Sequence, residues 1–135
     1  MRATLLKLPI TTALTLGQQG GQLQLNDAAR SICAQANFTY GSGGTTVDAY
    51  LQSSVDGGAT WFDIAEFHFT TASALVAFNL SSLTPQTTQV TLKNGTLAAN
   101  TAQDGLLGPQ FQVLVASTGT YVGSTLRIDV AAQER

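Results

Sequence analysis

The chain has 135 residues, of which 44% are hydrophobic, so it is long enough for one domain with one core and too apolar for intrinsic disorder. Its net charge of −2 and its dispersed lysines and arginines exclude a basic surface for DNA or RNA, and no apolar stretch reaches the length of a transmembrane helix. Only 10% of the residues are charged, against about a quarter in ordinary soluble domains. Neutral polar residues are less costly to bury than charges, so we expect a surface that neighbouring subunits cover; the alternative is a monomer with an uncharged exterior.

The first ten residues contain four large aliphatic side chains that would be unfavourable to expose in a soluble monomer. They are Leu5, Leu6, Leu8 and Ile10. Two interpretations remain open: residues 1–10 form an extended arm that contacts a partner, or they form the first edge strand of the domain. A secretory signal peptide is not expected, because Lys7 and Pro9 interrupt a short apolar run.

The rest of the chain alternates apolar and polar residues with the period of a β-strand. The clearest segments are 30–40, 45–55, 110–117 and 121–131, and the shorter candidates are 14–16, 22–25, 61–70, 75–80 and 89–93. Turn-forming residues separate them at Gly17–Gly21, Gly41–Gly44, Asp56–Gly58, Asn94–Gly95 and Thr118–Gly119. Residues 96–108, rich in Ala, Asn and Gly, are predicted to form a surface loop.

About eight or nine short strands without helical periodicity predict an all-β protein. We expect an antiparallel β-sandwich of about eight strands, jelly-roll-like, in a single domain over residues 1–135. The single cysteine, Cys33, excludes an intramolecular disulfide and is expected to be a buried thiol, because its segment is apolar and alternating. One Cys and one His are too few for a Cys/His zinc site.

The segment Ser54–Trp61 has the pattern S-x-D-x-G-x-T-W and resembles the Asp-box hairpin of sialidases and related β-proteins. The resemblance implies a structural turn built by Asp56, Gly57, Gly58, Thr60 and Trp61, with a low pKa for Asp56 and no catalytic role. Gly57 and Gly58 can adopt positive φ, and Asp56 can accept backbone N–H bonds, which Thr60 supports. Trp61 is expected to pack its indole on the core. A single box in 135 residues excludes a sialidase propeller.

The wider segment 47–65 also resembles segments of small structural proteins of tailed phages and prophages. This resemblance implies a capsid decoration (cement) protein on the exterior of the virion, which bridges subunits of the major capsid protein. Such a protein is expected as a dimer or trimer, with no nucleic acid, membrane or cofactor as partner. We expect its contacts at Leu5, Leu6, Leu8, Ile10 and Tyr50. A neck or tail protein is the alternative within the virion.

Catalysis is not expected. Glu66 and His68 would point the same way from one strand, so that the carboxylate could orient the imidazole, but no nucleophile motif accompanies them. The glycines of residues 41–44 lack the Lys of a phosphate-binding loop. Four aspartates are candidate calcium ligands, because calcium needs several convergent oxygen atoms. They lack EF-hand spacing, so no metal site is expected. They are Asp48, Asp56, Asp63 and Asp129.

A carbohydrate-binding module is the second functional hypothesis, from a different class. It needs an exposed aromatic side chain. Tyr50 shares the polar side of its strand with Asp48 and Gln52, which makes it the best candidate.

Overall fold

The structure is a computed structural model that describes residues 1–134, and within these residues it contains ten strands and no helix. Eight strands are long: β1 (Arg2–Ile10), β2 (Gly17–Gln24), β3 (Ala29–Thr39), β5 (Thr46–Ser54), β6 (Phe62–Phe69), β7 (Ala74–Ser81), β8 (Gln110–Thr118) and β10 (Ser124–Glu134). The short strands β4 (Ser42–Gly43) and β9 (Tyr121–Val122) form a separate two-stranded ribbon.

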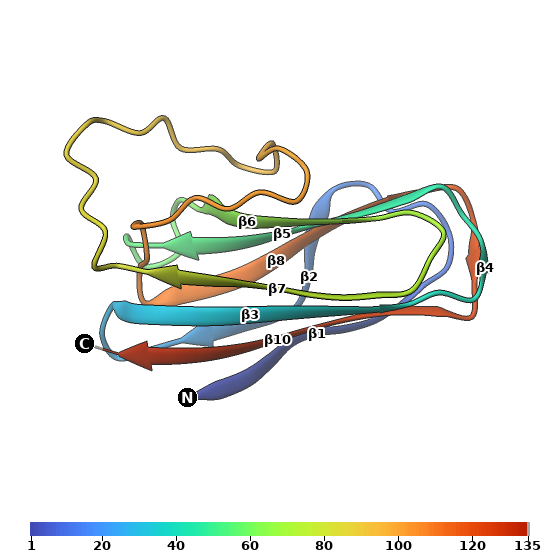
Figure 1. Cartoon of the computed structure of the whole chain (residues 1–135), viewed down its shortest axis with the longest axis horizontal. Coiled ribbons are helices and arrows are strands. Elements are labelled where there is room, and N and C mark those ends of the chain that lie inside the picture. The colour runs from blue at the N-terminus through green and yellow to red at the C-terminus, as the bar shows by residue number, and fades with distance from the viewer. Residues whose placement is uncertain (135) are drawn as a thin grey trace.

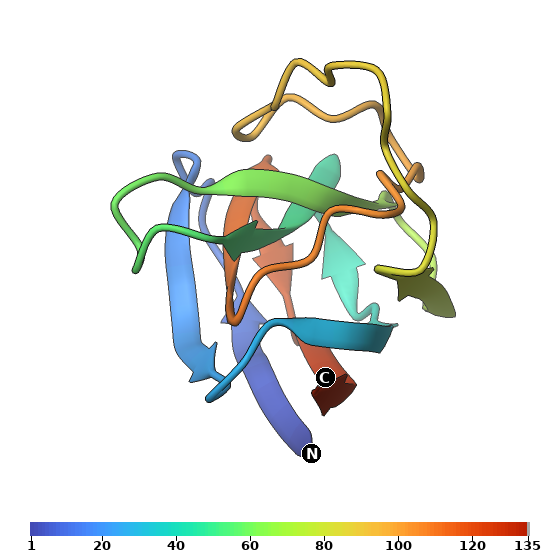
Figure 2. The same ribbon diagram turned by 90° about the vertical axis from the view of Figure 1, so that its left-hand side faces the viewer.

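The long strands form two four-stranded antiparallel sheets that pack face to face (Figures 1 and 2). Sheet A has the order β1-β10-β3-β7, and sheet B has the order β2-β8-β5-β6. The prediction of an all-β antiparallel sandwich is therefore confirmed. No helix of the described residues is long and apolar enough to cross a membrane.

The strand pairs are nested around the turn at Ser54–Trp61. β5 pairs with β6, β3 with β7, β2 with β8, and β1 with β10. The first half of the chain thus pairs in reverse order with the second half, as in one long ribbon whose tip is the Asp-box-like turn. The ribbon is then wrapped, so that most consecutive long strands lie in different sheets.

The hydrophobic core lies between the two sheets, because alternation turns every second side chain of each strand inward. Ile32, Ala34, Ala36 and Phe38 of β3 face inward and are buried. At one end the Phe38 ring stacks on Phe69, with centroids 5.1 Å apart, and meets the Tyr121 ring edge-on at 5.9 Å. The Tyr121 hydroxyl donates to the Thr70 carbonyl at 2.7 Å, so this buried phenol has a partner.

Residues 2–10 form an edge strand, as the second of the two interpretations of this segment predicted, and not an extended contact arm. Leu6 lies opposite Ile128 and Leu8 opposite Leu126 in the pairing with β10, and an irregularity between Thr4 and Leu6 turns Leu5 inward as well. Leu5, Leu6 and Ile10 are buried in the core, and Leu8 is half-buried against it. These side chains hold the sandwich together and cannot form a free contact surface.

Two further side chains lie elsewhere than predicted. Cys33 is exposed, because the alternation that buries Ile32 and Ala34 turns the residue between them outward. Trp61 is only half-buried and lies outside the core; its ring lies beside Gly58 in the turn.

Several predicted boundaries also differ. Residues 14–16 and 89–93 are not strands, and the glycine-rich segment 17–21, predicted as a turn, is the first half of β2. There Gly17 pairs with Val115 of β8, so the partner strand imposes extended backbone on residues with low strand propensity. Residues 121–131 are divided at Gly123, where φ is +69°.

A long loop, residues 82–109, joins β7 to β8 and lies against sheet B; it is the yellow-to-orange segment in Figure 1. Backbone hydrogen bonds attach it to the outer edge of β6: Asp63 N–H to Lys93 O, Glu66 N–H to Thr101 O, and Gln103 N–H to Ile64 O, at 2.7 to 2.9 Å. The predicted surface loop therefore also covers the edge of β6 and has a fixed path.

Candidate functional site

The turn Ser54–Trp61 is organised by one carboxylate. Asp56 Oδ1 accepts the Thr60 N–H and the Ser54 hydroxyl, each at 2.9 Å, and Oδ2 accepts the Thr60 hydroxyl. These bonds, chiefly those from Thr60, lower the pKa of Asp56 to about 2. Gly57 and Gly58 have φ of +77° and +89°, which L side chains rarely adopt. Every polar atom of the Asp56 carboxylate serves the turn.

The outer face of sheet B carries a row of hydrogen-bonded side chains from β2 to the long loop. The Gln22 amide donates to Gln112 Oε1 at 3.0 Å, the Gln112 amide donates to Gln52 Oε1 at 2.9 Å, and the Gln52 amide donates to Asp63 Oδ1 at 2.8 Å. We call Gln22, Gln112, Gln52 and Asp63 the amide row. All of them except Gln22 are buried.

Asp63 attaches the amide row to the loop. Its carboxylate accepts the backbone N–H groups of Gly95, Thr96 and Leu97 at 2.9 to 3.0 Å. A buried carboxylate that accepts several N–H bonds is satisfied without a cation. Asp63 is therefore a structural residue, and it is not available as a ligand for calcium.

Next to the amide row, Asp48, Glu66 and His68 form a compact cluster, which we call the Asp–Glu–His cluster. Asp48 of β5 lies directly opposite His68 of β6, and Glu66 is two residues before His68 on the same face. His68 Nδ1 lies 2.6 Å from Asp48 Oδ1, and one ligand atom from each of the three side chains lies within 4.8 Å of the others. The sequence indicated that Glu66 and His68 share a face, but the pairing with β5 adds Asp48.

Glu66 is the buried member of the cluster, with 1% of its surface exposed. Its Oε1 accepts the N–H of Asn100, a loop residue with φ of +57°. Burial is the main cause that raises the pKa of Glu66 to about 8, and a hydrogen bond with Asp48 raises it further. At neutral pH the Asp48–Glu66 carboxyl pair therefore holds a proton.

The other aspartates considered as calcium ligands are not brought to this cluster. Asp56 stays in its turn, and Asp129 lies on sheet A, where Oδ2 is 2.9 Å from Arg127 Nε. Tyr50 lies on the outer face of β5 between Asp48 and Gln52 and is half-buried, so it is less accessible than predicted. Burial, followed by the charge of Glu66, raises the pKa of its phenol.

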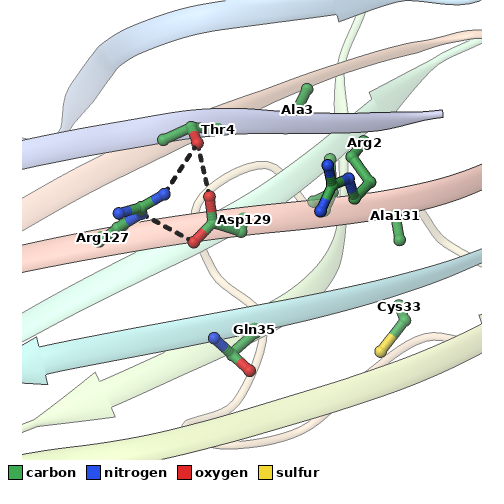
Figure 3. A pocket seen from close by; sticks show the side chains of 9 residues that line it. Arg2, Ala3, Thr4, Cys33, Gln35, Arg127, Asp129 and Ala131 are labelled. Carbon is green, nitrogen blue, oxygen red and sulfur yellow. Dashed lines mark hydrogen bonds and ion pairs between the residues drawn. The ribbon is translucent and has the colours of Figure 1, made fainter.

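The outer face of sheet A is open, and much of it, on β3, β7 and the end of β10, carries uncharged side chains. Its exposed uncharged residues include Cys33, Gln35, Asn37, Leu75, Ala77, Asn79, Ala131 and Gln133. A shallow hollow of about 690 Å³ lies where β1, β10 and β3 meet (Figure 3). Thr4 and Arg127 both bond to Asp129 in this hollow, and Arg2, Gln35 and Cys33 also line it.

The fold places basic side chains on sheet A and acidic side chains on sheet B, although the two kinds are interspersed along the sequence. Arg2 and Lys7 of β1 and Arg127 of β10 lie on the outer face of sheet A, where Lys7 pairs directly with Arg127 in the strand register. The strands of sheet B contain Asp48, Asp63 and Glu66 and no Lys or Arg. Cations that are far apart in the sequence are thus gathered by the β1–β10 pairing.

Strand β7 forms the second edge of sheet A, and no other strand of the described residues pairs with its free side. It contains no charged residue and no proline. Leu75 and Val76 on this strand are 64% and 40% exposed, and Leu83 just beyond it is 68% exposed. The outward side chains of β7 are directly adjacent to the uncharged side chains of β3 on the outer face of sheet A.

Comparison of the chain with models of known families, with curated proteins and with solved structures finds no match. The molecule is therefore defined by its architecture: a two-sheet antiparallel β-sandwich with one covered sheet and one open sheet. The Asp–Glu–His cluster lies on the covered sheet and the neutral face on the open sheet.

Proposed function

We propose that the chain is a structural virion protein that decorates and stabilises a phage capsid by bridging subunits of the major capsid protein. The observation that carries the proposal is the unguarded β7 edge. An exposed edge strand is a template for pairing with another chain, and stable monomers protect it with charges, proline or bulges. The sequence Ala74–Ser81 contains no charge or proline, and its residues stay in continuous register with β3. An edge of this kind is suited to a partner that covers it.

The open face beside β7 supports the same proposal. Its neutral side chains, among them Gln35, Asn37, Ala77 and Asn79, lose little free energy of hydration when a neighbour covers them. They are also short, which allows a partner backbone to approach closely. Interface cores are depleted in charged residues, and the part of this face formed by residues 33–37 of β3 and by β7 contains none.

The hollow gives this face a positive region at its other end. Arg2 and Arg127 lie there with a single acidic partner, Asp129. A carboxylate from the capsid protein would find complementary charge at this point, which favours the correct orientation during docking. We therefore propose that the neutral face and the hollow together meet the capsid, with the protein present as a dimer or trimer on a symmetry axis.

We further infer that the eight long strands have jelly-roll connectivity. The nested pairing of β5 with β6, β3 with β7, β2 with β8 and β1 with β10, split between two four-stranded sheets, supports this inference. Jelly rolls are found in viral capsid domains and also in lectins, so the fold is compatible with both functional hypotheses.

The test is co-sedimentation of the purified protein with undecorated tailed-phage capsids, with the number of bound copies per capsid measured. We expect saturation at a fixed stoichiometry that matches the capsid symmetry. Ala77→Lys, which places a charge on the outer face of β7, should abolish binding. Val55→Lys is the matched control: Val55 is 70% exposed in the Asp56 turn, away from sheet A, so this variant should bind as the wild type does.

Other outcomes contradict the proposal in distinguishable ways. A handful of copies per particle would indicate a neck or tail protein. Equal binding by Ala77→Lys and the wild type would show that β7 is not the contact. Binding to a glycan array that is lost in Tyr50→Ala would instead support a carbohydrate-binding module.

A further inference from the structure

We infer that Asp48, Glu66 and His68 form a binding site for one divalent transition-metal ion of the zinc type, which links β5 and β6 at the long loop. The inference is independent of the proposed function, since it concerns the covered sheet and not the face proposed to meet the capsid. It rests on the geometry, the burial and the donor chemistry of the Asp–Glu–His cluster.

The geometry already brings three donors to one point. Asp48 and His68 are paired residues of adjacent strands, and Glu66 follows the same face of β6, so the backbone of a rigid strand pair fixes all three. One donor atom from each lies within 4.8 Å of the others. Around a zinc ion with bonds of about 2.0 to 2.2 Å, ligand atoms lie roughly 3.3 Å apart. The three donor atoms therefore have to approach one another by no more than about 1.5 Å.

Glu66 gives the second, independent observation. Glu66 is 1% exposed, and its carboxylate lies close to another carboxylate, that of Asp48. Among the hydrogen bonds of residues 1–134, one N–H donor reaches the Glu66 carboxylate, from Asn100 at 3.0 Å. The ion pairs in the same part of the chain are His68–Asp48 and Arg127–Asp129, so neither Lys nor Arg compensates Glu66. A buried carboxylate that lies beside a second carboxylate and has no Lys or Arg partner is what a cation would stabilise.

The donor set selects the class of ion. Imidazole nitrogen and carboxylate oxygen are both ligand types that zinc takes, and zinc sites with three protein ligands leave a further position for water. Calcium and magnesium prefer oxygen ligands throughout, and calcium needs at least six of them. The side chains of His68 and Asp48 are 31% and 28% exposed, so the ion can enter from solvent and complete its coordination with water.

A bound ion would connect more than two strands. Glu66 accepts the Asn100 N–H, and the Asn100 side chain accepts the N–H of His68 at 3.0 Å, so the loop is bonded to both β6 ligands. Binding to the folded state alone raises the stability of that state by mass action. The ion would thus fix the loop against sheet B.

The test is calorimetric titration of ZnCl₂ into the full chain after treatment with EDTA. Cys33→Ser serves as the background, because the exposed thiol on the other sheet is a second zinc ligand. We expect one zinc ion per chain and a higher Tm in zinc than in EDTA. His68 is the only histidine, so its imidazole NMR signals report unambiguously whether the ion binds there.

Two conservative variants and one control complete the test. His68→Gln and Asp48→Asn should weaken zinc binding about 100-fold or more, since changes even to groups behind the ligands cost 10- to 100-fold. Asp129→Asn, which removes an exposed carboxylate on sheet A, should bind zinc as its parent does. Circular dichroism and the Tm in EDTA verify that each variant folds. Absence of zinc binding, binding without a shift of the His68 signals, or wild-type affinity in folded His68→Gln would each overturn the inference.

Discussion

The Gln52 amide donates to the Asp63 carboxylate at 2.8 Å across the β5–β6 pair, although an irregularity in the register lies beside this contact. The same Gln52 amide nitrogen donates to the side-chain oxygen of Asn94 in the loop at 2.8 Å. Gln52 and Asp63 are therefore the point at which the amide row of sheet B continues into the long loop. The path of the loop depends on side chains of the sheet that it covers.

The first prediction concerns the attachment of the loop. Asp63→Ala leaves the N–H groups of residues 95–97 and the Gln52 amide without their acceptor, so we expect a loss of about 3 kcal/mol in the free energy of unfolding. Urea denaturation measures this loss, and hydrogen exchange should show the amides of Gly95, Thr96 and Leu97 exchanging faster. Asp129→Asn, a control that breaks a partly exposed ion pair with Arg127, should cost no more than about 1 kcal/mol. Unchanged protection of the three amides would contradict this account of the loop.

The second prediction concerns the acid side of the stability curve. The pKa of Asp56 falls from 3.8 to about 2 on folding, so its ionised form stabilises the fold above pH 4. This stabilisation is lost as the pH falls from about 4 to about 2. Asp56→Asn should lower stability at pH 7 and flatten the curve in that window. Urea denaturation at several pH values checks this, and NMR titration of the carboxylate gives its pKa; a measured value near 4 would refute the prediction.

The third prediction concerns Glu66, whose effect on stability changes with pH in the direction opposite to that of Asp56. Its pKa is raised from 4.5 to about 8 on folding, so the folded state holds a proton that the unfolded state releases. The contribution of Glu66 to the free energy of unfolding should therefore be greatest below pH 4.5 and decline as the pH rises toward 8. Glu66→Gln should remove this decline. The measurement is urea denaturation from pH 5 to 8.5 in EDTA, and parallel curves for the two proteins would show that Glu66 ionises normally.

The fourth prediction compares two glycines with almost the same backbone. Gly44 and Gly57 have φ of +72° and +77°, but a Cβ on Gly44 would overlap the ring of Tyr121, whereas a Cβ on Gly57 meets no atom within 4 Å. Gly57→Ala should cost only the backbone strain, about 1 kcal/mol. Gly44→Ala should cost at least about 3 kcal/mol, because the buried ring must also move. Equal losses by chemical denaturation would contradict the packing of Tyr121 against this turn.

The fifth prediction concerns the thiol of Cys33. It is exposed on the outer face of sheet A, so a maleimide should label it in the folded protein at a rate comparable to that in denaturant. Mass spectrometry follows the reaction. A labelling rate far slower in the native state than in denaturant would show that Cys33 is buried. If the proposed capsid contact is correct, decorated capsids should protect the thiol.

The sequence predicted the elements that depend on local pattern. Alternation placed β3, β5 and β8 within one residue of their ends. The ends of β10 were missed by three residues, because Gly123 divides the predicted segment 121–131 and β10 runs on to Glu134. The motif at Ser54–Trp61 predicted the turn, because its geometry depends on contacts within the segment itself. The same alternation places Cys33 on the face opposite to its neighbours Ile32 and Ala34. The prediction of a buried Cys33 was wrong because it followed the apolar character of the segment and not this alternation.

Only the tertiary structure decided what depends on pairing between distant segments. The glycine-rich start of β2 is a strand because β8 pairs with it, and Leu5, Leu6 and Ile10 are core residues because β10 pairs with β1. Asp48 joins Glu66 and His68 through the register of β5 and β6, and Arg2, Lys7 and Arg127 gather on one face through the register of β1 and β10. Local sequence fixes the conformation and the facing of each strand, whereas the identity of its neighbours follows from the burial of the whole core, which no short segment contains.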